Sequence, residues 1–189
     1  MANISTESIT IRPARPQDAT ELSALIARTF SETFGPHTPP DDLAVHVAST
    51  YTPELQAAEI VDPAGNILVV ETTAPHGNSS LIGYAHLFRS PAPAVITGPT
   101  PLELKRFYVD FSWHGRGIAQ MLMTEVLRTA MAQGARTLWL GVWEGNARAI
   151  AFYRKYGFLR VGEHLFPVGS DPQIDWLLVR SLDATLGMP

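Results

Sequence analysis

The sequence predicts a mixed α/β fold in a single domain spanning residues 1–189. Three observations predict it. Apolar residues recur at helical spacing in some segments, while β-branched and aromatic runs bounded by turn residues mark others. A helical segment joins the strands predicted at 102–109 and 137–142, and a helix crossover joins parallel strands. The length of 189 residues, 46% of them apolar, is that of one ordinary domain.

The N-terminal third is predicted to hold one strand and then helices. Residues 8–12 alternate apolar and polar side chains as a short strand. Pro16 begins a helix whose apolar positions repeat at helical spacing until Gly35 breaks it. A second helix is expected at 40–50 and a third, short one at 54–59.

Two antiparallel strands follow, at 67–71 and 81–89, with a loop at Pro75–Ser80 between them. The segment 90–101 contains four prolines and is mostly apolar, so we expect a surface loop beside the functional site. The strand 102–109 begins directly after this loop.

The C-terminal half repeats the alternation of helix and strand. Gly134 and Gly157 mark two helix ends, where glycine is common. The elements predicted here are the helix 117–133, the strand 137–142, the helix 146–156 and the strands 160–166 and 174–179. The order is therefore β-α-α-β-β-β-α-β-α-β-β, with one mixed sheet that is antiparallel over its first strands.

Composition excludes several classes of function. A net charge of −4 with only two lysines argues against nucleic-acid binding, which needs a basic surface. No window approaches the ~20 apolar residues of a membrane span. The first ten residues lack a secretory signal and the chain has no cysteine, so we expect a cytoplasmic protein. The six histidines show no metal-ligand spacing, and no metal is expected.

A glycine-rich turn joins the strand 102–109 to the following helix, with the sequence His-Gly-Arg-Gly-Ile-Ala-Gln at 114–120. Such a turn bares backbone N–H groups, and the helix N-terminus adds partial positive charge, so together they can hold a pyrophosphate. Gly115 and Gly117 allow close approach of the backbone to phosphate, and Arg116 adds a charged donor. A tight turn without a ligand is the alternative interpretation.

A second motif lies on the helix 146–156. Asn146 is a natural N-cap, since its side chain can accept from an amide of the first turn. Asn146, Ile150 and Tyr153 share one face, and two turns separate the first from the last, roughly 10 Å. An extended ligand along that face would touch both Asn146 and Tyr153. The alternative interpretation is that Asn146 is only a helix cap and Tyr153 only a core residue. The neighbouring face is predicted to be core and consists of Ala149, Phe152 and Tyr156.

In this order the two motifs resemble those of the GCN5-related N-acetyltransferase (GNAT) superfamily, and the resemblance covers residues 9–180. The family's phosphate motif, Gln/Arg-x-x-Gly-x-Gly/Ala, is matched at 114–119 with His114 in place of Gln or Arg. Its second motif, Asn-x-x-Ala-x-x-x-Tyr-x-x-x-Gly-Phe, is matched from Asn146 to Phe158. The resemblance implies an acetyl-CoA-dependent N-acetyltransferase.

The resemblance also implies which residues do the work. The strand 102–109 would splay from its parallel neighbour 137–142, and its N–H groups at 107–109 would stabilise the oxyanion of the reaction. Tyr153 would protonate the departing thiolate, with no covalent enzyme intermediate. The residues implied to bind acetyl-CoA are Phe107, Tyr108, Val109, His114, Gly115, Arg116, Gly117, Ile118, Ala119, Gln120, Asn146 and Tyr153.

Glu103 is the candidate for the carboxylate that binds and deprotonates the acceptor. A primary amine has a pKa near 10 and only its neutral form attacks a thioester, so a base near it helps at pH 7. Strand alternation predicts that Glu103 shares a side with Lys105, Phe107 and Val109. The alternative is a surface carboxylate paired with Lys105.

A closer resemblance is to bacterial PaiA-type polyamine N-acetyltransferases, and it implies spermidine or spermine as acceptor. The stretches that carry it are 29–34, 139–144, 149–153 and the tail from Val168–Gly169 to Asp175. The residues then expected to contact the acceptor are Phe30, Glu32, Phe34 and His37. Acidic and aromatic groups suit a polycation, although Glu32 can equally be a solvated residue of an amphipathic helix end.

Two other functions are compatible with the same residues. The first is the same chemistry on a protein N-terminus, a lysine or another small amine, because acceptor choice varies within one fold. The second is a non-catalytic CoA-binding module. The oligomeric state is left open, with a homodimer as one option.

Overall fold

The computed structural model describes residues 7–74, 77–168 and 171–182. Its centre is a seven-stranded sheet in the order β1-β2-β3-β4-β5-β7-β6. All neighbours are antiparallel except β4 and β5, which are parallel, so the predicted mixed sheet is confirmed. The strands are β1 (Ser8–Pro13), β2 (Gly65–Thr73), β3 (Ser79–Phe88), β4 (Pro101–Val109), β5 (Thr137–Trp143), β6 (Leu159–Val168) and β7 (Asp171–Ser181).

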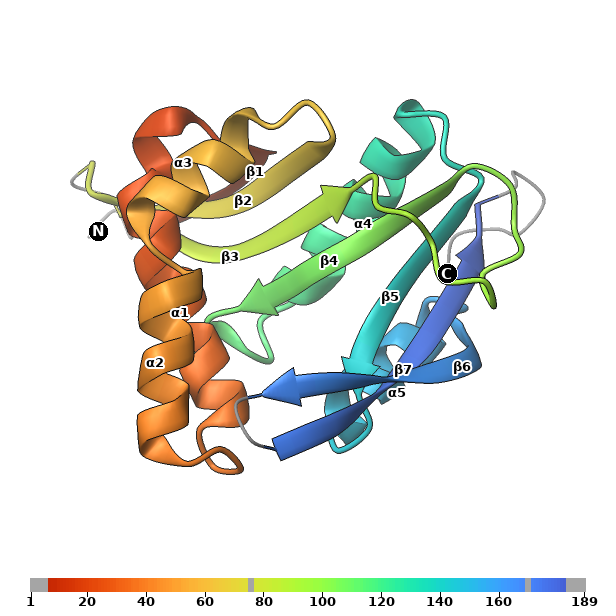
Figure 1. Cartoon of the computed structure of the whole chain (residues 1–189). Coiled ribbons are helices and arrows are strands. Elements are labelled where there is room, and N and C mark those ends of the chain that lie inside the picture. The colour runs from red at the N-terminus through yellow and green to blue at the C-terminus, as the bar shows by residue number, and fades with distance from the viewer. Residues whose placement is uncertain (1–6, 75–76, 169–170, 183–189) are drawn as a thin grey trace.

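Helices pack on both faces of this sheet (Figure 1). They are α1 (Ala19–Phe34), α2 (Pro40–Thr50), α3 (Pro53–Val61), α4 (Ile118–Ala132) and α5 (Ala147–Lys155). The largest core lies between the sheet and α4 and α5, and a second core lies between the sheet and α1–α3. The third helix is present, although the predicted element order omitted it. Thr52 caps α3 and accepts from the amide of Leu55.

β4 and β5 separate soon after they begin. Only Pro101–Glu103 pairs with Thr137–Trp139, and beyond these residues the two strands diverge (Figure 1). The prediction that the parallel strands part at one end is therefore confirmed. The divergence leaves the backbone of residues 104–109 without a ladder partner on its β5 side.

A β-bulge interrupts β4 near its middle. Leu87 pairs with Leu104, whereas the adjacent His86 pairs with Arg106, so Lys105 is the extra residue. A bulge places two residues opposite one and bends the strand that carries it. The bend contributes to the separation of β4 from β5.

The bulge also corrects one prediction from the sequence. Leu104 before the bulge and Phe107 and Val109 after it all pack toward the core beneath α4 and α5. Glu103, next to Leu104, therefore lies on the opposite side of the sheet from Phe107 and Val109. The predicted shared side was wrong because strict alternation does not continue through an extra residue.

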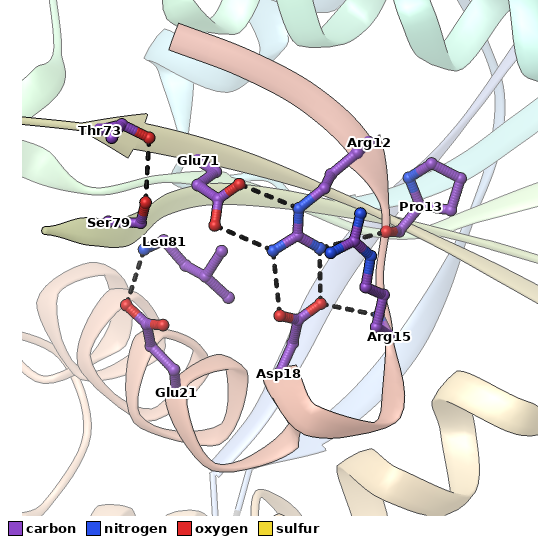
Figure 2. A network of polar contacts seen from close by, with 9 residues as sticks. All are labelled: Arg12, Pro13, Arg15, Asp18, Glu21, Glu71, Thr73, Ser79 and Leu81. Carbon is purple, nitrogen blue, oxygen red and sulfur yellow. Dashed lines mark hydrogen bonds and ion pairs between the residues drawn. The ribbon is translucent and has the colours of Figure 1, made fainter. Parts of the chain in front are cut away.

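A charged network fastens the N-terminal segment to the sheet (Figure 2). Arg12 of β1 donates to Asp18 at 2.7 and 3.0 Å and to Glu71 of β2 at 3.1 Å through each of two nitrogens. Asp18 also accepts from the Arg15 amide. The hydrogen bonds from Arg12 lower the pKa of both carboxyl groups. Every charge of this network has a partner, and none of its residues lines the two cavities described below.

Some predicted features fall outside the described residues. These are two residues of the Pro75–Ser80 loop, at 75–76, and Gly169 of the tail. Within the described part of the chain, no helix combines the length and the apolar character needed to cross a membrane.

Candidate active site

Two cavities meet where β4 and β5 part. The helix-side cavity, about 820 Å³, lies along the end of β4, the turn before α4 and the start of α5. The sheet-side cavity, about 540 Å³, lies between β4, β5 and β7 and reaches α1. The two cavities share six lining residues, Phe107, Tyr108, Trp143, Asn146, Ala149 and Tyr153. A ligand in one cavity can therefore react with a ligand in the other at this junction.

The turn before α4 bares its backbone to the helix-side cavity. Gly115 and Gly117 have φ values of +78° and +81°, which glycine adopts without strain. A Cβ added at either glycine would meet no atom within 4 Å, so the space in front of the turn is open. Gly117 is the N-cap of α4, and the first helical residues line the cavity. Unpaired amides at a helix N-terminus suit a phosphate group.

Arg116 does not line this cavity. Its guanidinium lies over the Trp113 ring, 4.7 Å from the centroid, and the indole packs on the core. The predicted phosphate contact of Arg116 thus has no support from its position, whereas its neighbours Gly115, Gly117, Ile118, Ala119 and Gln120 all line the cavity.

His114 fixes the turn in place. One ring nitrogen, Nε2, lies 2.8 Å from the Val109 carbonyl oxygen, and the other, Nδ1, lies 2.7 Å from a guanidinium nitrogen of Arg148. A carbonyl only accepts and a guanidinium only donates, so Nε2 donates and Nδ1 accepts. Both ring nitrogens are engaged with the protein, and Arg148 is held at the cavity wall.

Asn146 has the predicted capping role. Its side-chain oxygen accepts from the Ala149 amide at 3.0 Å. The two faces of α5 are less distinct than predicted: Asn146 and Tyr153 line both cavities, while Ala149, Phe152 and Tyr156 pack against the core and also line the helix-side cavity. Ile150 and Tyr153 are the buried residues, at 6% and 7% exposure. The predicted core face is only half-buried, because the splay leaves no strand to cover it.

Tyr153 stands at the junction of the two cavities. Its ring contacts those of Phe107 and Phe158, with centroids 6.3 and 5.6 Å away. Burial raises the pKa of Tyr153 above its usual range, so the phenol keeps its proton at any physiological pH. A buried phenol facing both cavities can donate a proton to a leaving group.

Aromatic rings hold the junction open. Phe107 stacks on Phe152 of α5 at 5.6 Å, and Tyr108 stacks on Tyr84 of β3 at 5.7 Å. Successive residues of β4 thus anchor to opposite sides of the sheet. The backbone between them lines both cavities.

Two carboxylates line the sheet-side cavity. Glu103 lies where β4 still pairs with β5, and it accepts from the Ser90 hydroxyl at 2.6 Å. Asp175 comes from β7 and pairs in register with Trp143, the last residue of β5. Asp175 was noted in the sequence only as part of a resemblance, because nothing in its local sequence marks it.

Two cations line the same cavity, and both are paired with one carboxylate outside it. Glu59 of α3 accepts from Lys105 at 3.1 Å and from Arg106 at 2.5 Å. Burial alone would raise the pKa of Glu59, yet these hydrogen bonds lower it, so it stays ionised. Lys105 and Arg106 are therefore held in ion pairs with Glu59, while Glu103 and Asp175 line the cavity.

The four residues predicted to contact the acceptor are not brought together. Phe30 and Phe34 line the sheet-side cavity, whereas Glu32 is exposed and lines the helix-side cavity. His37 lines neither cavity but packs its ring on Trp143, 4.8 Å between centroids. Among the described residues no three His, Asp or Glu side chains are grouped closely enough to hold a metal ion.

Comparison with known proteins agrees with this arrangement. A family model described as "Acetyltransferase (GNAT) family" matches residues 24–158. The chain belongs to the GNAT family. It is an acetyl-CoA-dependent N-acetyltransferase, and acetyl-CoA is its cosubstrate.

Relatives of this GNAT protein include two from mycobacteria. An uncharacterized N-acetyltransferase of Mycobacterium bovis is 37% identical over 165 residues, which are 87% of this chain and 98% of that protein. The N-alpha-acetyltransferase RimI of Mycobacterium tuberculosis is 34% identical over 99 residues, 49% of this chain and 58% of that one.

A solved structure has the same fold. The PaiA N-acetyltransferase from Thermoplasma acidophilum, in complex with coenzyme A, superposes with a TM-score of 0.68. The match covers 92% of this chain and 99% of that one at 20% identity, a level that establishes the fold alone.

Proposed function

We propose that the helix-side cavity binds acetyl-CoA and that the sheet-side cavity binds the acceptor amine. The open turn at Gly115–Gln120 fits a pyrophosphate because its amides are bare and no side chain fills the space before them. Asn146 and Tyr153 lie beyond it along α5, on the route toward the junction. An extended arm would reach the junction along that route and could pair with the unpaired backbone of β4.

We further propose that the acceptor is a polyamine such as spermidine or spermine. The observation that carries this is the pair of carboxylates in the sheet-side cavity, in a wall that also holds Trp139 and Trp143. Carboxylates bind ammonium groups, and indole faces attract cations while covering methylene chains. The cavity cations do not cancel this attraction: Glu59 pairs with both of them, and the three carboxylates Glu59, Glu103 and Asp175 outnumber the two cations.

In the proposed reaction the side chains move two protons. A cavity carboxylate attracts the ammonium group and removes one proton, which leaves to solvent. The neutral nitrogen attacks the thioester carbonyl, the unpaired β4 amides stabilise the negative oxygen, and the carbon–sulfur bond breaks. Tyr153 gives its proton to the sulfur, and the second proton lost by the nitrogen restores the phenol. The products are the N-acetyl amine and the free thiol.

A protein N-terminus is the second candidate acceptor, and the likeness to RimI favours it. One feature of the structure opposes it. The segment between β3 and β4 forms part of the wall of the sheet-side cavity through Ser90, Pro91 and Pro93, and it is anchored by Ile96, which is 7% exposed and packs with Trp139 and Leu177. A small amine needs only the remaining opening, whereas a peptide needs an exit for its chain.

Thiol release from acetyl-CoA tests the choice of acceptor. The acceptors are spermidine, spermine, a lysine-containing peptide with a blocked N-terminus, and a peptide with a free N-terminal alanine. We expect kcat/KM to be highest for a polyamine. A peptide with a kcat/KM above that of both polyamines would overturn the assignment and favour the corresponding protein acceptor.

A further inference from the structure

A carboxylate on β7 stands out among the charged groups outside the predicted site. Asp175 is half-buried and lines the sheet-side cavity. Within the described part of the chain its oxygens make no hydrogen bond and no ion pair. Other carboxylates inside the protein, such as the buried Asp18 and the half-buried Glu59, are each bound by arginine. A carboxylate kept inside the protein without a partner costs stability, so its retention indicates a partner that comes with the substrate.

The backbone of β5 makes room for this carboxylate. A Cβ added to Gly141 would lie 3.3 Å from Oδ2 of Asp175 and 3.4 Å from Cε1 of His164. Both side chains therefore lie over a strip of β5 that has no side chain of its own. The carboxylate and the imidazole form one wall of the cavity above Gly141.

Asp175 lies at the reacting end of the cavity. Its backbone pairs with Trp143, a residue that lines both cavities. Burial raises the pKa of Tyr108 at the junction, and the nearby charges of Tyr153 and Asp175 raise it further. Glu103 lies at the other end, since it pairs with Trp139. The backbone levels of Trp139 and Trp143 are about 13 Å apart at about 3.3 Å per residue, and the Asp175 carboxylate leans from the Trp143 level over Gly141.

We propose that Asp175 receives the reacting amine and takes its proton, and that Glu103 binds a distant ammonium group of the same acceptor. The assignment rests on the proposed function. It divides between two carboxylates the binding and the deprotonation of the acceptor, which were both predicted for Glu103. Methylene chains separate the charges of a polyamine, so a cavity with one carboxylate at each end matches its shape. Glu103, held by Ser90, is suited to binding and Asp175 to proton removal.

The surroundings of Asp175 favour this role. Burial raises its pKa, and the neighbouring His164 only partly offsets the rise, so Asp175 is a stronger base than an exposed aspartate. The titratable groups around it are His164 on β6, Glu103, Lys105, Arg106 and Tyr108 on β4, and Tyr153 on α5. Glu59 pairs with both cations, so neither reaches Asp175 as an ion-pair partner.

Two matched variants test the division of labour, Asp175→Asn and Glu103→Gln. For Asp175→Asn we expect kcat/KM to fall by about 10²-fold at pH 7 and by much less at pH 9, where more of the amine is already neutral. Acetyl-CoA affinity, measured by calorimetry, should be unchanged and shows that the variant is folded. For Glu103→Gln we expect KM for spermidine to rise by about 10-fold, with a smaller fall in kcat than in Asp175→Asn and with no difference between pH 7 and pH 9.

The outcomes separate this inference from the proposed acceptor. The variants are assayed with whichever primary amine the wild-type protein acetylates fastest, so failure of polyamines as acceptors leaves the test of Asp175 intact. Wild-type kcat/KM in Asp175→Asn, or an equal loss at pH 7 and pH 9, overturns the role of Asp175 as base. A stronger pH-dependent loss in Glu103→Gln than in Asp175→Asn returns that role to Glu103.

Discussion

The two cavities of this enzyme are built from different parts of the chain. The helix-side cavity is lined mainly by the end of β4, the turn at 114–120 with its bare backbone, and α5. The sheet-side cavity is made of side chains from β3, β4, β5, β6 and β7 and from the α1–α3 region. A cofactor common to a whole family can be held by backbone amides, while the acceptor, which varies, is read by side chains that can change without loss of the fold.

This difference predicts a complete loss of cofactor binding when a negative charge is introduced into the turn at 114–120. Gly117→Glu places a carboxylate beside the phosphates and forces a side chain into positive φ, so acetyl-CoA binding should be abolished in calorimetry. Gly134→Glu is the matched control, because Gly134 has φ +76° and equally open surroundings at the opposite end of α4. Both variants carry the same strain, ~1–2 kcal/mol. Equal binding by the two variants would remove the turn from the cofactor site.

The junction should show the next largest effect. Tyr153→Phe removes only the hydroxyl, so packing and acetyl-CoA affinity should be kept while kcat falls by on the order of 10²-fold. The loss is partial because a thiol with a pKa near 8.5 can leave as thiolate. Tyr156→Phe is the control, since Tyr156 lines the same cavity but its hydroxyl is 3.5 Å from the Gln120 carbonyl oxygen.

A wild-type kcat in Tyr153→Phe, with chemistry shown to limit the rate, would make Tyr153 a packing residue. A fall of similar size in both tyrosine variants would point instead to a general disturbance of α5. Single-turnover kinetics separates the chemical step from product release in either case.

The same difference explains how far the sequence could be interpreted. The turn and the Asn146 cap were predictable because each depends on residues close together in the chain, whereas the splay of the parallel strands was predicted only from the resemblance to a family. The side of the sheet on which each β4 side chain lies was not predictable. The alternation is reversed by the extra residue Lys105, which exists only through the pairing of β4 with β3. The faces of α5 were predicted only in part, because Ala149, Phe152 and Tyr156 pack against the core and also line the helix-side cavity. The position of Asp175 in the cavity was not predictable either, because it depends on the pairing of β7 with β5.

A smaller effect is expected where a side chain supports the backbone site. His114→Ala removes both hydrogen bonds of the ring, to the Val109 carbonyl and to Arg148. We expect KM for acetyl-CoA to rise roughly fivefold, about 1 kcal/mol, with kcat little changed. His114→Gln, which restores the residue type common in the family, should recover part of the affinity.

A double-mutant cycle identifies the contact responsible. Arg148→Met, His114→Ala and the double variant should be non-additive in acetyl-CoA affinity if the two side chains act through each other. Additive losses would mean that each residue contacts the cofactor separately, in which case His114 is a phosphate ligand and not a support for the turn.

The smallest effects should be on stability, and they should have opposite signs in two aspartates. The pKa of Asp18 is lowered by Arg12, so Asp18 stabilises the fold above its unfolded pKa, and this is lost as pH falls through the folded value. The pKa of Asp175 is raised by burial, so stability is lost as pH rises through its folded value. At pH 7 Asp18→Asn should lose ~2 kcal/mol, whereas Asp175→Asn should gain ~1 kcal/mol, or about 2–4 °C in Tm.

Thermal unfolding at pH 7 and at pH 4 checks both signs. The deficit of Asp18→Asn should shrink only slightly at pH 4, because the lowered pKa keeps folded Asp18 largely ionised there, whereas the gain of Asp175→Asn should shrink more, because the raised pKa brings this carboxylate closer to neutral. The two carboxylates differ in their partners: Asp18 is paired with Arg12, while Asp175 has no hydrogen-bond or ion-pair partner among the residues that the structure describes. Loss of stability in Asp175→Asn would show that the chain itself satisfies this carboxylate, and a ligand would no longer be needed to account for it.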